Sequence, residues 1–147
     1  MKCWLNGRDK IMGLVYTEIT LKNAGDIIVA QRGYTKETEV RQITLTAMVD
    51  TGAWTLVINE AVRQQLGLDI IGRKPGSLAD GTSAEYDMAG PVEVHWRDRS
   101  TTCEALVLPN AKDILLGAIP MEGLDLIVHP QKEEVIGAHG ENPMYNI

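Results

Sequence analysis

Apolar and polar residues alternate along much of this chain, which is the period-two pattern of strands that bury one face. In residues 39–49, aliphatic side chains from Ile43 to Val49 fall on one face, and polar side chains such as Thr44 fall on the other. Residues 13–23 alternate in the same way. The pattern therefore predicts two half-buried strands in these segments.

Shorter apolar runs, separated by turn residues, predict further strands. They cover residues 77–79, 82–88, 92–96, 101–108, 114–116, 126–128 and 134–136. Many short strands with turns between them are typical of a β-barrel or a β-sandwich. The run Ile27–Ala30 favours one more short strand, inside a glycine-containing connection whose shape the sequence leaves open and which we expect to be mobile.

Two short helices interrupt the strand pattern. Asn59 is a favourable N-cap, and Gly67 stands where a helix C-terminus favours a left-handed residue, so a helix of about two turns is predicted between them. The same order of apolar strand, glycine and short helix is repeated at residues 114–123. Asp80-Gly81 predicts a type I′ hairpin turn, because both central positions of that turn need a positive φ. A second hairpin is expected to turn at residues 97–100.

Length and composition restrict the class of protein. A chain of 147 residues has the size of one ordinary domain. Residues 1–11 precede the first patterned segment and are interpreted as an N-terminal extension, whose order and role the sequence leaves open, and residues 12–147 are interpreted as a single domain. The net charge of −6 argues against a protein that binds nucleic acid through a basic face.

No apolar run approaches the ~18 residues of a membrane helix, and charges stand where a signal peptide needs its apolar stretch. Cys3 and Cys103 are too few for a disulfide framework, which fits a reducing compartment. We therefore expect a cytoplasmic protein without membrane association.

The candidate chemistry lies in Asp50-Thr51-Gly52-Ala53, which follows the predicted strand 39–49 directly. A carboxylate is thereby fixed at a corner between two apolar stretches, where burying its charge is costly unless it is paired or hydrogen-bonded. A carboxylate in such a place often has a chemical role. The alternative is an Asx-turn, in which Asp50 only caps its own corner beside a flexible glycine.

Several motifs together resemble the retropepsin-like aspartic proteases. They are Asp50-Thr51-Gly52-Ala53, the helix after Asn59, the Asp80-Gly81 hairpin and Ile114-Leu115-Leu116-Gly117. The resemblance covers residues 39–129 and includes the order of the elements. It implies an all-β fold: a closed retropepsin-like β-barrel with a flap hairpin and one or two short helices, which assembles as a homodimer.

The resemblance also implies roles for individual residues. Asp50 is expected to be the catalytic carboxylate, Thr51 to brace the loops of two subunits, and Gly52 to let those loops approach. Leu115, Leu116 and Gly117 are expected to support the loop from below. The residues expected to contact substrate are Ala53, Ala79, Asp80, Gly81 and Thr82.

Peptide hydrolysis by carboxylates needs two of them, one ionised and one protonated. The chain contains a single Asp-Thr-Gly, so a two-fold homodimer is expected to supply the second. The predicted function is an aspartic endopeptidase acting on peptides or unfolded protein segments. Two features depart from the family pattern: Trp54 stands beside the motif, and Ala118-Ile119-Pro120 follows Gly117 where polar residues are common.

Other functions remain as alternatives. The principal one is a retropepsin-like module that binds peptides without cleaving them, and a second is an enzyme that uses Asp50 alone as a nucleophile. The three histidines, His95, His129 and His139, share no metal-ligand spacing, and no phosphate-binding glycine loop or serine-hydrolase elbow is present. We therefore expect neither a metal nor a cofactor, and Asp113 and Asp125 are interpreted as turn or cap residues.

Overall fold

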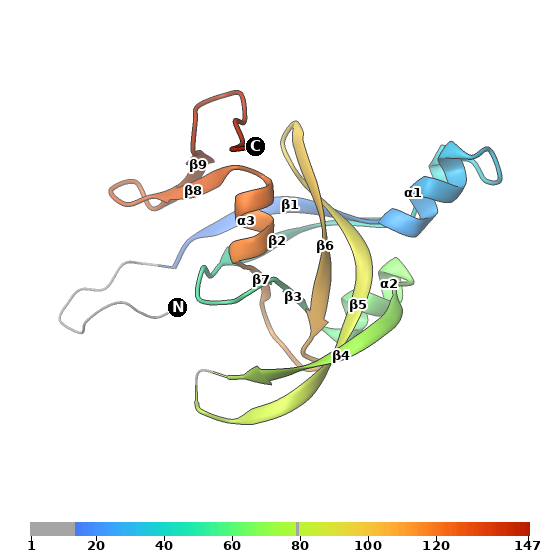
Figure 1. Ribbon diagram of the computed structural model, residues 1–147, viewed down its shortest axis with the longest axis horizontal. Coiled ribbons are helices and arrows are strands. Elements are labelled where there is room, and N and C mark those ends of the chain that lie inside the picture. The colour runs from blue at the N-terminus through green and yellow to red at the C-terminus, as the bar shows by residue number, and fades with distance from the viewer. Residues whose placement is uncertain (1–13, 79) are drawn as a thin grey trace.

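The computed structural model describes residues 14–78 and 80–147. Within these residues a seven-stranded sheet has the order β1-β2-β7-β3-β6-β5-β4, and β1 also pairs with β5. The first six strands of that order therefore close into a barrel, while β4 extends from it (Figure 1). The strands of this sheet are β1 (Tyr16–Asn23), β2 (Gln42–Val49), β3 (Leu56–Ile58), β4 (Asp69–Ser77), β5 (Ser83–Trp96), β6 (Arg99–Val107) and β7 (Ile114–Leu116).

The barrel is mixed, because β2 pairs with β7 and β3 pairs with β6 in parallel, while the other pairs are antiparallel. Aliphatic side chains of the strands form its core, and others from the segments between strands complete it. The largest fully buried side chains include Ile19, Leu21, Leu56, Ile58, Leu66, Leu68, Met88, Val92, Val94, Leu116 and Leu124. The predicted closed all-β barrel with a flap hairpin and few short helices is confirmed.

Both predicted helices are present. Helix α2 (Glu60–Leu66) begins after Asn59, whose side-chain oxygen accepts a hydrogen bond of 2.9 Å from the backbone N–H of Val62. It ends at Gly67, which has the left-handed φ of 63° that glycine adopts without steric cost. Helix α3 (Ala118–Gly123) follows β7 directly.

The short strand favoured at Ile27–Ala30 was wrong, because these residues belong to helix α1 (Ala24–Gln31). Their β-branched side chains favour a strand, but the buried Asn23 caps the helix by accepting a hydrogen bond of 3.0 Å from the backbone N–H of Asp26. The short 3₁₀ helix η1 (Glu37–Glu39) completes the connection to β2.

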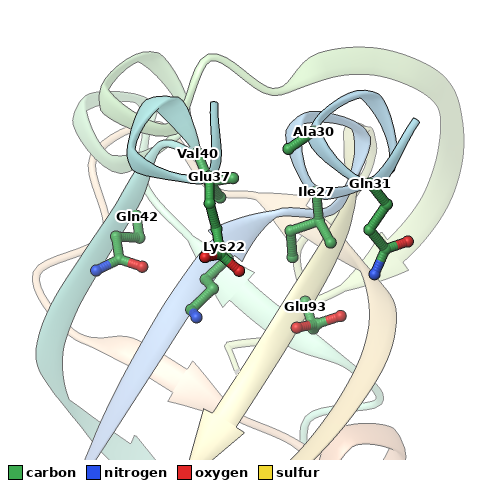
Figure 2. A pocket seen from close by; sticks show the side chains of 8 residues that line it. All are labelled: Lys22, Ile27, Ala30, Gln31, Glu37, Val40, Gln42 and Glu93. Carbon is green, nitrogen blue, oxygen red and sulfur yellow. The ribbon is translucent and has the colours of Figure 1, made fainter. Parts of the chain in front are cut away.

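Helices α1 and η1 lie over the ends of β1, β2 and β5, and leave a cavity of about 410 Å³ between them (Figure 2). Its walls mix apolar side chains such as Ile27 with the charged side chains of Lys22, Glu37 and Glu93. This connection, residues 24–41, is called the α1 excursion below. It joins the end of β1 to the start of β2.

The flap hairpin differs from its prediction in length. Strand β4 begins at Asp69, not at residue 77, because a β-bulge between Ile70 and Gly72 lets it pair with β5 despite glycine and proline in its sequence. Strand β5 is one strand of 14 residues where two were expected, since another bulge between Ala89 and Val92 carries the pairing past Gly90-Pro91.

The turn of this hairpin is not the two-residue type I′ turn. The backbone N–H of Leu78 donates to Thr82 O, and that of Gly81 donates to Leu78 O, so the connection is longer than two residues. Gly81 has a φ of 88°, and the carboxylate of Asp80 accepts a hydrogen bond from the backbone N–H of Thr82. The second hairpin does turn where predicted, between β5 and β6.

A separate two-stranded sheet forms from β8 (Leu126–His129) and β9 (Glu134–Gly137), which pair with each other. The buried Asp125 precedes it and accepts hydrogen bonds from His139 and from the backbone N–H of Met144. These contacts tie the C-terminal segment to the turn between α3 and β8. No helix in the described part of the chain is long and apolar enough to cross a membrane.

Candidate active site

Residues 50–55, called the Asp50 loop below, leave the barrel at the end of β2. The backbone N–H of Asp50 donates a 3.0 Å hydrogen bond to Leu116 O, at the end of the parallel neighbour β7. On the other side of the loop, Ala118 and Ile119 donate backbone hydrogen bonds of 2.9 and 3.1 Å to the carbonyl oxygens of Ala53 and Trp54. The start of α3 therefore holds the loop through main-chain contacts that do not depend on side-chain identity.

Gly117 makes this close approach possible. A Cβ atom added there would lie 2.2 Å from Thr55 O and 2.6 Å from Ala53 O, which no side chain can occupy. The buried Thr55 anchors the end of the loop, because its hydroxyl donates a 2.8 Å hydrogen bond to Glu104 O of β6. The segment Leu115-Leu116-Gly117 thus packs against the loop, at the position expected for it.

The carboxylate of Asp50 is half-buried, and one oxygen accepts a 3.0 Å hydrogen bond from the backbone N–H of Gly52. The backbone N–H of Ala53 also donates to Asp50 O. This is the Asx-turn that was considered as an alternative. It fixes the direction of the carboxylate, and so it is compatible with a chemical role.

Asp50 lies at a groove with a volume of about 620 Å³ between the Asp50 loop and the β4–β5 hairpin. Most of its walls are apolar, and they come from the Asp50 loop, the hairpin and strands β3, β6 and β7. The lining residues are Asp50, Gly52, Ala53, Trp54, Thr55, Val57, Pro75, Gly76, Ser77, Leu78, Tyr86, Leu106, Leu108 and Leu115. A carboxylate at the edge of an apolar groove of this size is suited to binding an extended apolar segment.

The hairpin forms one wall of this groove as a flap does. The ring of Tyr86 packs against Gly76, where an added Cβ would lie 3.0 Å from the ring. At the tip, the hydrogen bond from the backbone N–H of Thr82 holds the pKa of Asp80 below its ordinary value. Asp80 is therefore ionised and structures the tip.

The structure brings some of the predicted site residues together and separates others. Asp50, Gly52 and Ala53 line the groove, whereas the exposed Thr51 lies on the surface of the loop outside the lining. The predicted flap contacts Asp80, Gly81 and Thr82 lie at the tip and are not among the lining residues. Ala79 lies outside the described residues.

Sequence reasoning missed the part of the flap that lines the groove, residues 75–78 and Tyr86. Only the pairing of β4 with β5 brings these residues to the groove, and the glycine and proline residues of β4 argue against a strand there in the sequence. The alternation from Ala84 to Met88 is the sequence signal that could have identified Tyr86, since it places Tyr86 on the same strand face as Ala84 and Met88.

Other reactive groups lie in different environments. Burial raises the pKa of the Cys103 thiol to about 11, so it is protonated near neutral pH and is a poor nucleophile. The lowered pKa of Asp125 follows first from its hydrogen bond with His139, and its carboxylate holds the C-terminal segment. No three metal-ligating side chains come together among residues 14–78 and 80–147.

Comparison with known families decides the assignment. A family profile described as aspartyl protease matches residues 37–119, which is more than half of the chain. The chain belongs to the aspartyl protease family. The match runs from η1 to the start of α3, so the aspartyl protease region includes the Asp50 loop, the groove and the flap. A search of curated proteins found no match.

The resemblance seen in the sequence is thereby confirmed at the level of the family. Strand β1, helix α1 and strands β8 and β9 lie outside the matched region. The matched region thus contains all the barrel strands except β1, and with them the loop that carries Asp50.

Proposed function

We propose that this protein is an aspartic endopeptidase, active as a homodimer in which each copy contributes one Asp50. The observation that carries the proposal is the position of Asp50, which is held by backbone hydrogen bonds at an apolar groove beside a flap. The aspartyl protease match over the same residues supports it. Binding alone would not need a carboxylate fixed in this way.

The need for two copies follows from the chemistry. A single carboxylate cannot both accept a proton from water and donate one to the scissile carbonyl in the same step. Two carboxylates close together share one proton, so that one is ionised and the other neutral. Since the chain has one Asp-Thr-Gly, a two-fold axis beside the Asp50 loop would create the pair.

The surface around the loop is suited to self-association. Trp54 lies in the loop with 45% of its surface exposed, and Ile119, whose backbone N–H bonds to Trp54 O, is 43% exposed. Leu14 is 68% exposed and precedes Val15, whose carbonyl accepts from the backbone N–H of Val49. These apolar side chains therefore lie in the loop or near its two ends, where a second copy would cover them.

The β8–β9 hairpin offers a second contact. Its strands pair with each other in a sheet separate from the barrel, so their outer edges can accept a strand of the second copy. Ile127 of β8 is 46% exposed. We propose pairing through β9 in preference to the C-terminal residues 141–147, which form no strand in the structure.

The reaction proceeds without a covalent intermediate. The ionised Asp50 accepts a proton from water while the oxygen of that water attacks the peptide carbonyl carbon, and the protonated Asp50 of the second copy donates to the carbonyl oxygen. The resulting tetrahedral diol then collapses: the C–N bond breaks, the nitrogen takes a proton from the dyad, one diol hydroxyl returns its proton to the dyad as the C=O bond forms, and a carboxylic acid and an amine leave. The dyad ends with the single shared proton with which it began.

The substrate in this proposal is an extended peptide or an unfolded protein segment. Such a segment can place alternate side chains in the apolar groove and pair its backbone with the flap, as in β-augmentation. A folded strand has its edges occupied and would not fit. The cytoplasmic location expected from the sequence stays a prediction.

Cleavage of a peptide library made from denatured proteins, mapped by mass spectrometry between pH 4 and 7, tests the proposal. The wild-type protein should produce cuts that are absent with Asp50→Asn, while the exposed-carboxylate control Asp113→Asn should cut as the wild type does. Cuts that persist in Asp50→Asn would refute the role of Asp50. An intact library with a dimeric wild-type protein would instead favour the module that binds peptides without cleaving them.

A further inference from the structure

The flap carries two neighbouring cations, Arg73 and Lys74, on opposite faces of strand β4. Arg73 is paired with Asp87, its cross-strand partner, with 3.1 Å between Nε and Oδ1. Lys74 lies opposite Tyr86, which lines the groove. Lys74 is therefore on the face of the flap that is turned toward the groove.

Lys74 has a different electrostatic environment from Arg73. Its Nζ lies 4.8 Å from the centroid of the Trp54 ring, over the ring. An aromatic face attracts a cation but has no net negative charge to neutralise it. The positive charge of Lys74 thus remains available to a carboxylate that enters the groove.

Trp54 determines where this charge lies. It belongs to the Asp50 loop and lines the groove, and Pro75, next to Lys74, lines it as well. The Trp54 ring thus holds the ammonium at the rim of the groove that contains Asp50. An extended peptide bound in the groove would pass this rim a few residues from the bond presented to the dyad.

Resting on the proposed function, we propose that Lys74 is a specificity-determining residue that favours substrates with an Asp or Glu side chain close to the cleaved bond. Trp54 is the positioning residue for its ammonium. The departure of Trp54 from the family pattern then has a physical consequence: it provides the surface on which a flap cation is held. Because the remaining lining is mostly apolar, this selection acts on one substrate side chain only.

The test uses pairs of peptides built on a mapped cleavage site, identical except for Glu or Gln at one of the three positions on either side of the cut. For wild-type protein, kcat/KM should be roughly three- to fivefold higher with Glu at one position, the range of an exposed ion pair. The difference should arise mainly in KM and should fall toward one as salt is raised from low to high concentration.

The variant Lys74→Gln should bring the Glu-to-Gln ratio to about one, and Lys74→Glu should favour the corresponding peptide with Lys. The matched control is Arg73→Gln, which removes the same charge from the opposite face and should keep the wild-type ratio. The proposal would be overturned if the Glu-to-Gln ratio of kcat/KM were unchanged in Lys74→Gln. It would also be overturned if that ratio were one for wild-type protein at every peptide position tested.

A binding measurement separates this proposal from the proposed function. Fluorescently labelled extended peptides of apolar sequence, identical except for Glu or Gln at one position, are titrated into Asp50→Asn protein, with and without Lys74→Gln, and followed by anisotropy. If the wild type cleaves nothing, the proposed function fails, but tighter binding of Glu peptides that is lost in Lys74→Gln still supports Lys74 as the selecting residue. Equal binding of both peptides would refute it in either case.

Discussion

The two ends of strand β2 carry connections that are held by different kinds of contact. After β2, main-chain hydrogen bonds from β7 and α3 hold the Asp50 loop, and Gly117 lets the three segments touch. Before β2, the α1 excursion depends largely on side chains: Asn23 bonds to Leu66 O and Gly67 O, and Asp26 forms a two-point ion pair with Arg41. Figure 1 shows the two regions on opposite sides of the barrel.

The Asp50 loop must hold a side chain in a fixed position, whereas the α1 excursion has no such requirement. A backbone network has no titratable groups, so the position of Asp50 should not change over the pH range in which a carboxylate dyad works. The α1 excursion contains a titratable ion pair and lies largely outside the matched aspartyl protease region. We therefore expect changes at the Asp50 end to affect catalysis, and changes at the α1 end to affect stability alone.

The largest effect is expected from Gly117→Ala. The added methyl group would overlap the carbonyl oxygens of Ala53 and Thr55, so α3 and the Asp50 loop must move apart. The free energy of unfolding should fall by about 3 kcal/mol, as for severe overpacking. Cleavage should fall by roughly 100-fold, because a displacement of about 1 Å has that effect.

Denaturant unfolding and kcat/KM measured on the same preparation check this prediction. Gly72→Ala is the matched control, since a Cβ at Gly72 would meet no atom within 4 Å. A Gly117→Ala protein that keeps more than half of the wild-type cleavage rate would show that the loop is not held in the way described.

A smaller effect, confined to stability, is expected from Asn23→Ala. The change removes the N-cap of α1 and two hydrogen bonds to the C-terminus of α2, and leaves those carbonyl groups without these donors. The free energy of unfolding should fall by about 2 kcal/mol. Asn23→Ser, which keeps a capping oxygen, should lose less.

Measuring cleavage shows whether a change before β2 also affects the Asp50 loop after β2. Cleavage by Asn23→Ala, measured without denaturant and expressed per folded protein, should match that of the wild type. If kcat/KM instead fell in proportion to the loss of stability, the two ends of β2 would be coupled and the comparison would fail.

The smallest effect is expected from the ion pair of the α1 excursion. The hydrogen bond and charge of Arg41 lower the pKa of Asp26 below its ordinary value of 3.8. The stabilisation is therefore fully present above pH 4 and is lost as the pH falls through the lower pKa of the folded state. Asp26→Asn should be less stable than the wild type by at most about 1 kcal/mol near pH 6, since the pair is largely exposed.

Urea unfolding of both proteins between pH 6 and pH 2 measures this difference. The two free energies should converge as the pH falls below 4. A difference that stays constant down to pH 2 would mean that Asp26 acts through its helix-terminal position and not through its charge.

The parts of the fold that could be predicted from sequence are those with local signals. Helix α2 has both an N-cap at Asn59 and a left-handed glycine at Gly67, and β7 is a short apolar run that a glycine follows directly. The α1 excursion was misread because the cap at Asn23 is supported by contacts with Leu66 and Gly67, which lie far along the chain. Local preference for a strand was overridden by tertiary contacts.

The candidate site also contains residues that a local motif predicts and residues that only tertiary contacts bring together. Asp50 could be found because its chemistry lies in consecutive residues, Asp-Thr-Gly-Ala. The groove wall from residues 75–78 and Tyr86 could not, because it depends on the register of β4 against β5 and on two β-bulges. The contact between Lys74 and Trp54 joins separate elements, and nothing in either segment predicts it alone.

The central claim is that the active unit is a pair of Asp50 loops. Cleavage of one mapped peptide, measured across a wide range of protein concentration and compared with sedimentation over the same range, tests it most directly. The specific activity should rise with concentration and level off as the dimer fraction reaches one. A specific activity that stays constant down to concentrations at which the protein is monomeric would contradict the claim.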